Sequence, residues 1–223
     1  MKYRIDEELV RLGQERMGDA PVEGFVYGQG LREPELMLIG EAPGEFELVD
    51  GIPFIGRAGR ELMASLDSIG LTRDDVYITS AVRSRPYRWG TKRERDGTMT
   101  ERKYNRTPNA REILAHAPLL DDELANVRPK IIVTLGNIGL QRLLGKSVKV
   151  GDVHGQLLQA PIQHLADLSD KKYSLTESPR TIIPTFHPAS VFYNPKLREA
   201  VKQDWQAIGE ALRQFGGTGF DRQ

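Results

Sequence analysis

The chain has 223 residues, with 31 Lys plus Arg and 31 Asp plus Glu, so its formal net charge at pH 7 is zero. Its hydrophobic content of 39% predicts one ordinary domain with a real core and excludes a disordered polyelectrolyte. No apolar run approaches the roughly 18 residues that a membrane-spanning helix needs, and the N-terminus lacks the apolar segment of a secretory signal. We therefore expect a cytoplasmic, monomeric protein that does not contact membranes.

Apolar runs rich in branched residues alternate with amphipathic stretches, a pattern typical of a parallel sheet covered by helices. In chain order the pattern predicts strands at Phe25–Gly28 and Leu36–Gly40, a helix at Gly59–Gly70, a strand at Val76–Ser80, a helix at Asn109–Asn126, a strand at Ile131–Gly136, a helix at Asn137–Leu144, strands at Gln156–Ala160 and Thr181–Phe186, and a helix at Pro195–Phe215. We expect an α/β fold with three α/β/α layers around a central, mostly parallel sheet. A single domain would span residues 1–215, followed by a flexible tail at residues 216–223.

The segment Arg83–Arg106 differs from the rest of the chain. It holds nine Lys or Arg against three acids, has aromatic residues among them and shows no apolar period, so it is predicted to be a long loop. Such a composition is typical of a solvated surface. It also suits nucleic acid, because phosphates attract cations and unstacked bases stack on aromatic rings. The candidate nucleic-acid contacts here and elsewhere are Arg57, Arg83, Arg85, Arg88, Lys92, Arg93, Phe192 and Lys196.

Two glycine-rich motifs are candidates for a binding site. The first, Gly40-Glu41-Ala42-Pro43-Gly44, follows a predicted strand, and ligands bind at the carboxyl ends of parallel strands. The alternative is a tight connection with a solvated Glu41. The second motif, residues 51–59, places Phe54 between glycines before a helix. That ring is either a plug of the core or a stacking platform with open space beside it.

A third candidate is His187, in Phe186-His187-Pro188-Ala189-Ser190 at the end of a predicted strand. A lone histidine is more often structural than catalytic. Its position at a strand end, followed by a loop shaped by proline, favours a functional role.

In their joint order these motifs resemble family 4 of the uracil-DNA glycosylase superfamily. That family has GEAPG, an acidic spacer and GxPFVGxAG, and this chain has GEAPGEFELVDGIPFIGRAG with the same spacing. The likeness continues through VYGQG, RSRP, NRTP, RPKIIVTLGNIGLQRLLG, HPAS and NPKLREAVKQDW, and so covers most of Val26–Phe215. The resemblance implies a monofunctional DNA glycosylase that flips a damaged base, uracil, into a pocket and hydrolyses its N-glycosidic bond in base-excision repair.

The resemblance also implies roles for single residues. Phe54 would stack on the flipped base, and backbone amides near Gly40, Glu41 and Ala42 would hold its oxygens. His187 would donate a hydrogen bond to the departing base, and either Glu41 or Glu47 would orient the attacking water. This chemistry requires DNA as partner and no metal or redox cofactor.

The chain departs from the family in two places. Family 4 members hold an iron–sulfur cluster with four cysteines, whereas this chain has no cysteine, and Ser84 and His116 stand where two of them would fall. The cluster is therefore expected to be absent, with its structural role passed to packing. Ser80 stands where the family has the asparagine that reads uracil. A serine hydroxyl that rotates to suit either pattern of donors would relax the choice of base.

Two other functions are compatible with the sequence. A non-catalytic or weakly catalytic homologue that binds damaged or single-stranded DNA is favoured by Ser80, whereas the retained Glu41, Phe54 and His187 favour the enzyme. An enzyme acting on free nucleosides is disfavoured by the basic segment, since a nucleoside offers no row of phosphates.

Overall fold

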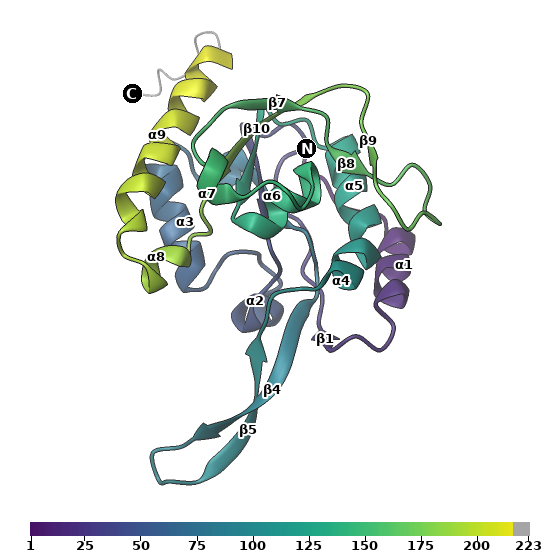
Figure 1. The fold of residues 1–223 in the computed structure, drawn as a ribbon, viewed down its shortest axis with the longest axis vertical. Coiled ribbons are helices and arrows are strands. Elements are labelled where there is room, and N and C mark those ends of the chain that lie inside the picture. The colour runs from purple at the N-terminus through teal and green to yellow at the C-terminus, as the bar shows by residue number, and fades with distance from the viewer. Residues whose placement is uncertain (216–223) are drawn as a thin grey trace.

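The centre of the molecule is a five-stranded sheet in a computed structural model that describes residues 1–215; the predicted tail lies outside these residues. The sheet order is β3-β2-β6-β10-β7, and the first four strands run parallel while β7 is antiparallel to β10 (Figure 1). The bounds are β2 Leu36–Gly40, β3 Val76–Ser80, β6 Ile131–Leu135, β7 Leu158–Ala160 and β10 Arg180–Thr185. Because β3, β2, β6 and β10 run parallel, their carboxyl ends lie together at one edge of the sheet.

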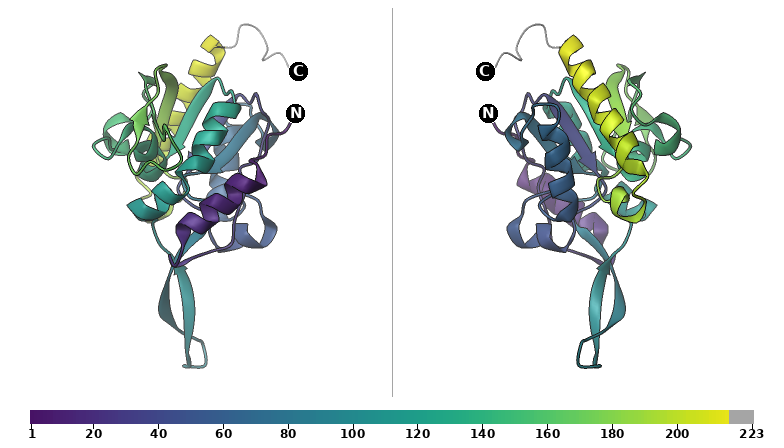
Figure 2. Two further views of the ribbon diagram at one scale, coloured as in Figure 1. Left: turned by 90° about the vertical axis from the view of Figure 1, so that its right-hand side faces the viewer. Right: turned by 90° about the vertical axis from the view of Figure 1, so that its left-hand side faces the viewer.

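Helices cover both faces of this sheet, which is why its inner strands are continuous apolar runs. On one face lie α3 (Arg57–Asp67) and α9 (Leu197–Phe215), shown on the right of Figure 2. On the other lie α5 (Ala117–Asn126) and α6 (Asn137–Leu144). The predicted α/β fold with three layers is confirmed. Within residues 1–215 no helix is both long and apolar enough to cross a membrane.

Shorter elements complete the body. Helix α1 (Glu7–Met17) packs against α4 (Ala110–Ala115) and α5 (Figure 2, left). The sequence had a signal for α1 that the apolar pattern missed, because Asp6 caps it by accepting a hydrogen bond from the Glu8 amide at 2.8 Å. The remaining elements are β1 Val22–Glu23, α2 Glu45–Asp50, a 3₁₀ turn Arg73–Asp75, α7 Val150–Val153, β8 Gln163–His164, β9 Ser174–Leu175 and α8 Ser190–Tyr193.

Two predicted elements are wrong in detail. The single helix Asn109–Asn126 is broken at His116, because Pro118 has no amide hydrogen to continue the helical ladder. The predicted strand Phe25–Gly28 is not a strand of the sheet. The Val26 amide instead donates to the Arg83 carbonyl at 2.9 Å, so this segment crosses the sheet edge with isolated hydrogen bonds.

The predicted loop Arg83–Arg106 is also wrong, because most of it forms an antiparallel hairpin. Strands β4 (Arg85–Arg93) and β5 (Met99–Asn105) pair along their length and project from the body as an arm (Figure 1). A strand is recognised in sequence by alternation between a buried and a solvated face. Beyond its base the arm has solvent on both faces, so polar residues occupy most positions of both and no sustained alternation of apolar and polar residues arises.

A buried ion pair connects the end of β3 to α5. Arg83 and Glu123 are 1% and 0% exposed and are paired with each other. The Glu123 carboxylate also accepts hydrogen bonds from the hydroxyls of Tyr77 at 3.0 Å and Thr79 at 2.6 Å. The sequence prediction of Arg83 as a DNA contact is therefore corrected: its guanidinium is enclosed by protein and cannot reach a phosphate.

Replacing Glu123 by Gln should lower the free energy of unfolding by about 3–5 kcal/mol, because it leaves the Arg83 guanidinium buried without a counter-ion. Urea denaturation followed by circular dichroism measures the loss. Arg11→Gln is the control, since it removes an exposed pair with Glu8 and should change stability by about 0.5 kcal/mol or less. Equal, small effects of both substitutions would contradict the structural role of the buried pair.

Candidate functional site

A pocket of about 280 Å³ opens where β2, β3 and β10 end. The sequence-predicted residues that line it are Ala42, Glu47, Phe54, Arg57, Ser80 and His187. These residues come from four separate segments, and they meet because parallel strands present their carboxyl ends at one edge. Asn105, at the base of the arm, also lines the pocket and was missed. Its place in NRTP marked a family motif but gave no sign of where the side chain lies.

Phe54 is held in an unusual backbone conformation. Its φ of 54° makes it the one non-glycine residue of positive φ within residues 1–215. Arg73 stabilises this turn by donating hydrogen bonds to the carbonyls of Pro53 at 2.9 Å and Phe54 at 2.6 Å. A Cβ on Gly40 would lie 2.8 Å from the Phe54 ring, so a glycine is required there. The ring therefore packs against the end of β2, and the surrounding contacts keep the strained backbone of Phe54 in place.

His187 presents an N–H group beside that ring. Its Nδ1 accepts a hydrogen bond from the Ala189 amide at 3.1 Å, so the proton of the neutral imidazole must be on Nε2. Burial lowers the pKa of His187 to about 4, which keeps the imidazole neutral at pH 7. Its ring centroid is 5.9 Å from that of Phe54. The pocket therefore combines an aromatic face with a neutral hydrogen-bond donor.

The two candidate carboxylates have different surroundings. Glu47 lines the pocket, and its Oε2 accepts a hydrogen bond from the Gly44 amide, which caps α2. Glu41 directly follows β2 and is not among the residues that line the pocket. Burial raises the pKa of Glu41 above its ordinary value, although a hydrogen bond from Thr107 lowers it in part. The carboxylate of Glu41 is therefore a stronger base than that of an ordinary glutamate. One oxygen of Glu47 is already engaged by the Gly44 amide.

The hydroxyl of Ser80 is fixed by its neighbours. It donates a hydrogen bond to the Val82 carbonyl at 2.7 Å and accepts a longer one from Arg83 Nη1 at 3.4 Å. A carbonyl can only accept and a guanidinium can only donate, so both directions are settled. The expectation of a hydroxyl that turns to suit any base is therefore corrected: the group available to the pocket is a lone pair of Oγ.

The predicted DNA contacts differ in their surroundings, because some are buried, some are paired and some are exposed. Arg85 is 4% exposed and binds Glu23 and Asn105, each at 2.6 Å, so it holds the base of the arm and is corrected as a phosphate contact. Lys92 is exposed but paired with Glu94. Arg57 lies 3.8 Å over the Phe192 ring, which brings two predicted residues together at the rim of the pocket. Among the predicted contacts, Arg88 and Arg93 on the arm and Lys196 before α9 are also exposed and belong to no ion pair within residues 1–215.

The residues at the expected positions of an iron–sulfur cluster do not fit one. His116 is fully buried, and its Nδ1 accepts the Arg83 amide at 2.8 Å. Burial lowers the pKa of His116 to about 3. Ser84, which follows Arg83 in the chain, is also buried. Met17, Val82 and Ala115 pack together in the same region. The chain offers no thiolate, and apolar packing occupies this part of the fold.

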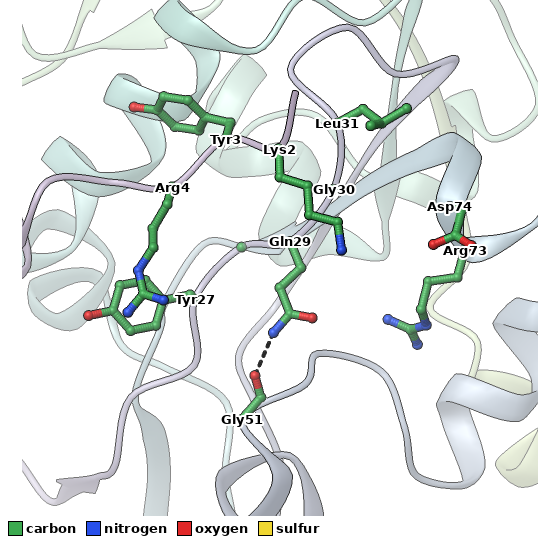
Figure 3. A pocket seen from close by; sticks show the side chains of 11 residues that line it. Lys2, Tyr3, Arg4, Tyr27, Gln29, Gly30, Leu31, Gly51, Arg73 and Asp74 are labelled. Carbon is green, nitrogen blue, oxygen red and sulfur yellow. Dashed lines mark hydrogen bonds between the residues drawn. The ribbon is translucent and has the colours of Figure 1, made fainter.

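A larger cavity of about 590 Å³ lies at the outer side of β3, near the N-terminus (Figure 3). Two of its cations are engaged, since Arg4 lies over the Tyr27 ring at 4.0 Å and Arg73 holds the Phe54 turn. The Gln29 amide donates to the Gly51 carbonyl at 2.6 Å. None of the predicted site residues lines this cavity, so the smaller pocket is the candidate site.

Comparisons with known proteins agree with this geometry. The family model of the uracil DNA glycosylase superfamily matches residues 27–209. The chain is 35% identical over 192 residues to a Type-4 uracil-DNA glycosylase of Saccharolobus solfataricus, covering 84% of this chain and 76% of that protein. It is 32% identical to a Type-4 uracil-DNA glycosylase of Archaeoglobus fulgidus (88% and 86% covered) and 30% identical to one of Thermotoga maritima (94% and 98% covered).

Replacing Gly40 by Ala should displace the Phe54 ring and lower the free energy of unfolding by about 1–3 kcal/mol, because the added methyl overlaps a rigid ring. Thermal unfolding measures the change. Gly151→Ala is the matched control: Gly151 lies in α7 with open space around its Cα, so alanine should be neutral or slightly stabilising. A Gly40→Ala protein as stable as Gly151→Ala would show that the ring is not held against β2.

Proposed function

Because the chain belongs to the uracil-DNA glycosylase superfamily, we propose that it hydrolyses the N-glycosidic bond of uracil in DNA and so begins base-excision repair. The observation that carries the proposal is the pairing of the Phe54 ring with the neutral Nε2–H of His187 in one pocket. A flipped pyrimidine needs an aromatic face to stack on and a donor for its carbonyl oxygen. Phe54 and His187 supply one each.

The proposed reaction separates charge, and the pocket stabilises the anion. When the bond from the sugar to the base breaks, the sugar becomes oxocarbenium-like and the base leaves as an anion. The His187 Nε2–H donates to the base oxygen on which this negative charge collects. Because burial lowers the pKa of His187 to about 4, the imidazole does not take up a second proton at pH 7 and remains a neutral donor.

Water must attack the sugar carbon and give up a proton, and we propose that the Glu41 carboxylate accepts this proton. Its raised pKa makes its carboxylate a stronger base than an ordinary glutamate. Backbone hydrogen bonds from Ala81 to Gly40 and from Val82 to Glu41 extend the pairing of β2 with β3, so the backbone of Glu41 follows directly on the Gly40–Ser80 pair. Glu47 keeps the loop in place by capping α2.

Replacing Glu41 by Gln should lower kcat by about 100- to 10,000-fold, the usual contribution of a general base. A base must be ionised, so the wild-type rate should fall as pH drops through the raised pKa of Glu41, and Glu41→Gln should lack this acidic limb. Glu47→Gln is the control, since glutamine also completes a capping box. If Glu41→Gln keeps its activity and Glu47→Gln loses it, the general base is Glu47 and not Glu41.

The fixed hydroxyl of Ser80 suggests which bases the pocket accepts. A lone pair on Oγ pairs with a ring N–H, which uracil has at N3 and hypoxanthine has at N1. Cytosine and adenine present a ring nitrogen with its own lone pair at that place, so two acceptors would face each other. The Ser80 contact therefore separates bases with a ring N–H next to a carbonyl, a group that also includes thymine and guanine, from cytosine and adenine. Discrimination against cytosine survives the loss of the family's asparagine.

Release of bases from oligonucleotides tests both the activity and this range. We expect the wild-type protein to release uracil and hypoxanthine and to leave cytosine and adenine in place. Ser80→Ala should lower both rates by roughly fivefold, which corresponds to one hydrogen bond of about 1 kcal/mol. Ser80→Asn, which can meet both N3–H and O4, should raise uracil release. Binding of uracil-containing DNA without release of any base would replace the enzyme by a recognition protein.

Contacts to the DNA backbone complete the proposal. Arg57 with Phe192 and the exposed Lys196 flank the pocket, and Arg88, Lys92 and Arg93 extend the basic surface along the arm. Phosphate neutralisation releases counterions, so affinity should fall steeply with salt although the chain has no net charge. Local charge, and not the total, determines this dependence.

A further inference from the structure

The arm carries an ordered aromatic surface outside the pocket. Tyr87 and Trp89 alternate along β4 and therefore share one face, and Lys103 is the cross-strand partner of Trp89. The two rings meet edge to face, with centroids 6.0 Å apart and planes at 82°. Lys103 Nζ lies 4.2 Å from the Tyr87 centroid and 5.4 Å from the Trp89 centroid. We call Tyr87, Trp89 and Lys103 the aromatic face of the arm.

Packing within the described residues does not account for this face. Trp89 is 60% exposed, although burial of so large a ring would normally contribute to stability. Strand β1 pairs with β4 only at Arg85 and Pro86, so Trp89 lies beyond the three-stranded part of the arm. A two-stranded ribbon in water is marginally stable by itself. An exposed tryptophan there therefore contributes little to the stability of the fold unless something else covers it.

The arm leaves the body beside the pocket. Asn105, the last residue of β5, lines the pocket, and Arg102 binds Glu45 of α2 at 3.0 Å. In Figure 1 the arm extends from the end of the body where α2 and α8 lie. Residues of α2 line the pocket, so the pocket lies at this end of the body. Strand β4 has nine residues and spans roughly 27 Å at about 3.3 Å per residue. A DNA strand with one base in the pocket can therefore run along the arm for several nucleotides.

The charge of the arm selects a polyanion as its partner. Residues 85–105 hold seven Lys or Arg and three Asp or Glu. Within residues 1–215, Arg88 and Arg93 are exposed cations with no ion pair. A ligand that suits both these cations and the aromatic face must combine phosphates with uncovered aromatic rings. Unpaired DNA has both, whereas duplex DNA hides the faces of its bases in its own stack.

We propose that the aromatic face stacks on unpaired bases of the strand that carries the target base, so that the arm makes single-stranded DNA the preferred substrate. This inference rests on the proposed function for its substrate, but the stacking itself needs no catalysis. Stacking of a base on an aromatic ring is tolerant of sequence, so the preference is for unpaired DNA of any sequence.

Tryptophan fluorescence tests the stacking directly. The chain has two tryptophans, Trp89 on the arm and Trp205, which is 2% exposed in the core. In a Trp205→Phe protein, titration with a uracil-free 15-mer of thymidine should quench the Trp89 emission, and a duplex of equal length should quench it far less. If Trp205→Phe does not fold, the difference between wild type and Trp89→Phe isolates the same signal. Absence of quenching by the single strand would overturn the proposal.

Affinity measurements with variants provide the second test. Trp89→Ala should weaken binding of the thymidine 15-mer by about 5- to 100-fold, and Trp89→Phe should retain most of the affinity. Duplex affinity should change by less than twofold. Leu175→Ala is the control, because Leu175 is 62% exposed on β9, away from the arm. Equal losses for single-stranded and duplex DNA would overturn the proposal and leave the arm as a general phosphate contact or a docking site for protein.

Uracil release separates this inference from the proposed function. On single-stranded uracil DNA, Trp89→Ala should raise KM, with a larger change than on the duplex. If wild type and Trp89→Ala release uracil with the same kcat/KM, on single-stranded DNA as on the duplex, the arm has no such role. The glycosylase activity would then stand unchanged. Failure of the wild-type protein to release uracil would refute the activity, while the binding and quenching results would still decide the stacking.

Discussion

The buried guanidinium of Arg83 is the interaction on which the other parts of the structure converge. Its side chain pairs with Glu123 of α5, its Nη1 contacts the Ser80 hydroxyl, and its amide donates to His116 at the junction of α4 and α5. Two residues further along the chain the arm begins. One residue thus connects the end of the sheet, a covering helix, the lining of the pocket and the start of the arm. A charge buried in this way persists only when it is paired and hydrogen-bonded.

The pocket is organised before any ligand enters it. Arg73 holds the strained turn at Phe54, Gly40 leaves room for the ring, the Ala189 amide fixes the tautomer of His187, and Glu47 caps the helix that follows GEAPG. Each of these contacts fixes a group in advance that the proposed reaction would otherwise have to orient. Preorganised dipoles and donors act strongly in a site of low dielectric, since they need no rearrangement when charge develops.

In the proposed function the arm and the pocket divide recognition between them. The pocket would distinguish one base from another through a small set of directed groups, whereas the arm offers charge and aromatic surface without directed contacts to base edges. A charge of zero over the whole chain conceals this division, because residues 85–105 hold seven Lys or Arg against three acids, whereas the rest of the chain holds 24 Lys or Arg against 28 acids. Electrostatic attraction between exposed groups acts over about one Debye length, so the local excess governs an approaching DNA strand.

The amino-acid sequence by itself determined the fold class and most strands and helices, because buried parallel strands such as β2 and β6 are apolar runs and helices such as α6 have clear boundaries. It also marked Phe54, Ser80 and His187 as site residues through motif order, and the structure places all three in one pocket. Family motifs carry such information because function restricts residue type and spacing together.

Only the tertiary structure decided what each polar group near those motifs does. Arg83 and Arg85 are indistinguishable from Arg88 in the sequence, yet two are buried against carboxylates and the third is exposed, since burial depends on partners such as Glu123 that lie far along the chain. The direction of the Ser80 hydroxyl and the pairing of the arm likewise depend on groups brought close by folding. Local sequence specifies which donors and acceptors exist, and long-range packing determines which of them remain free.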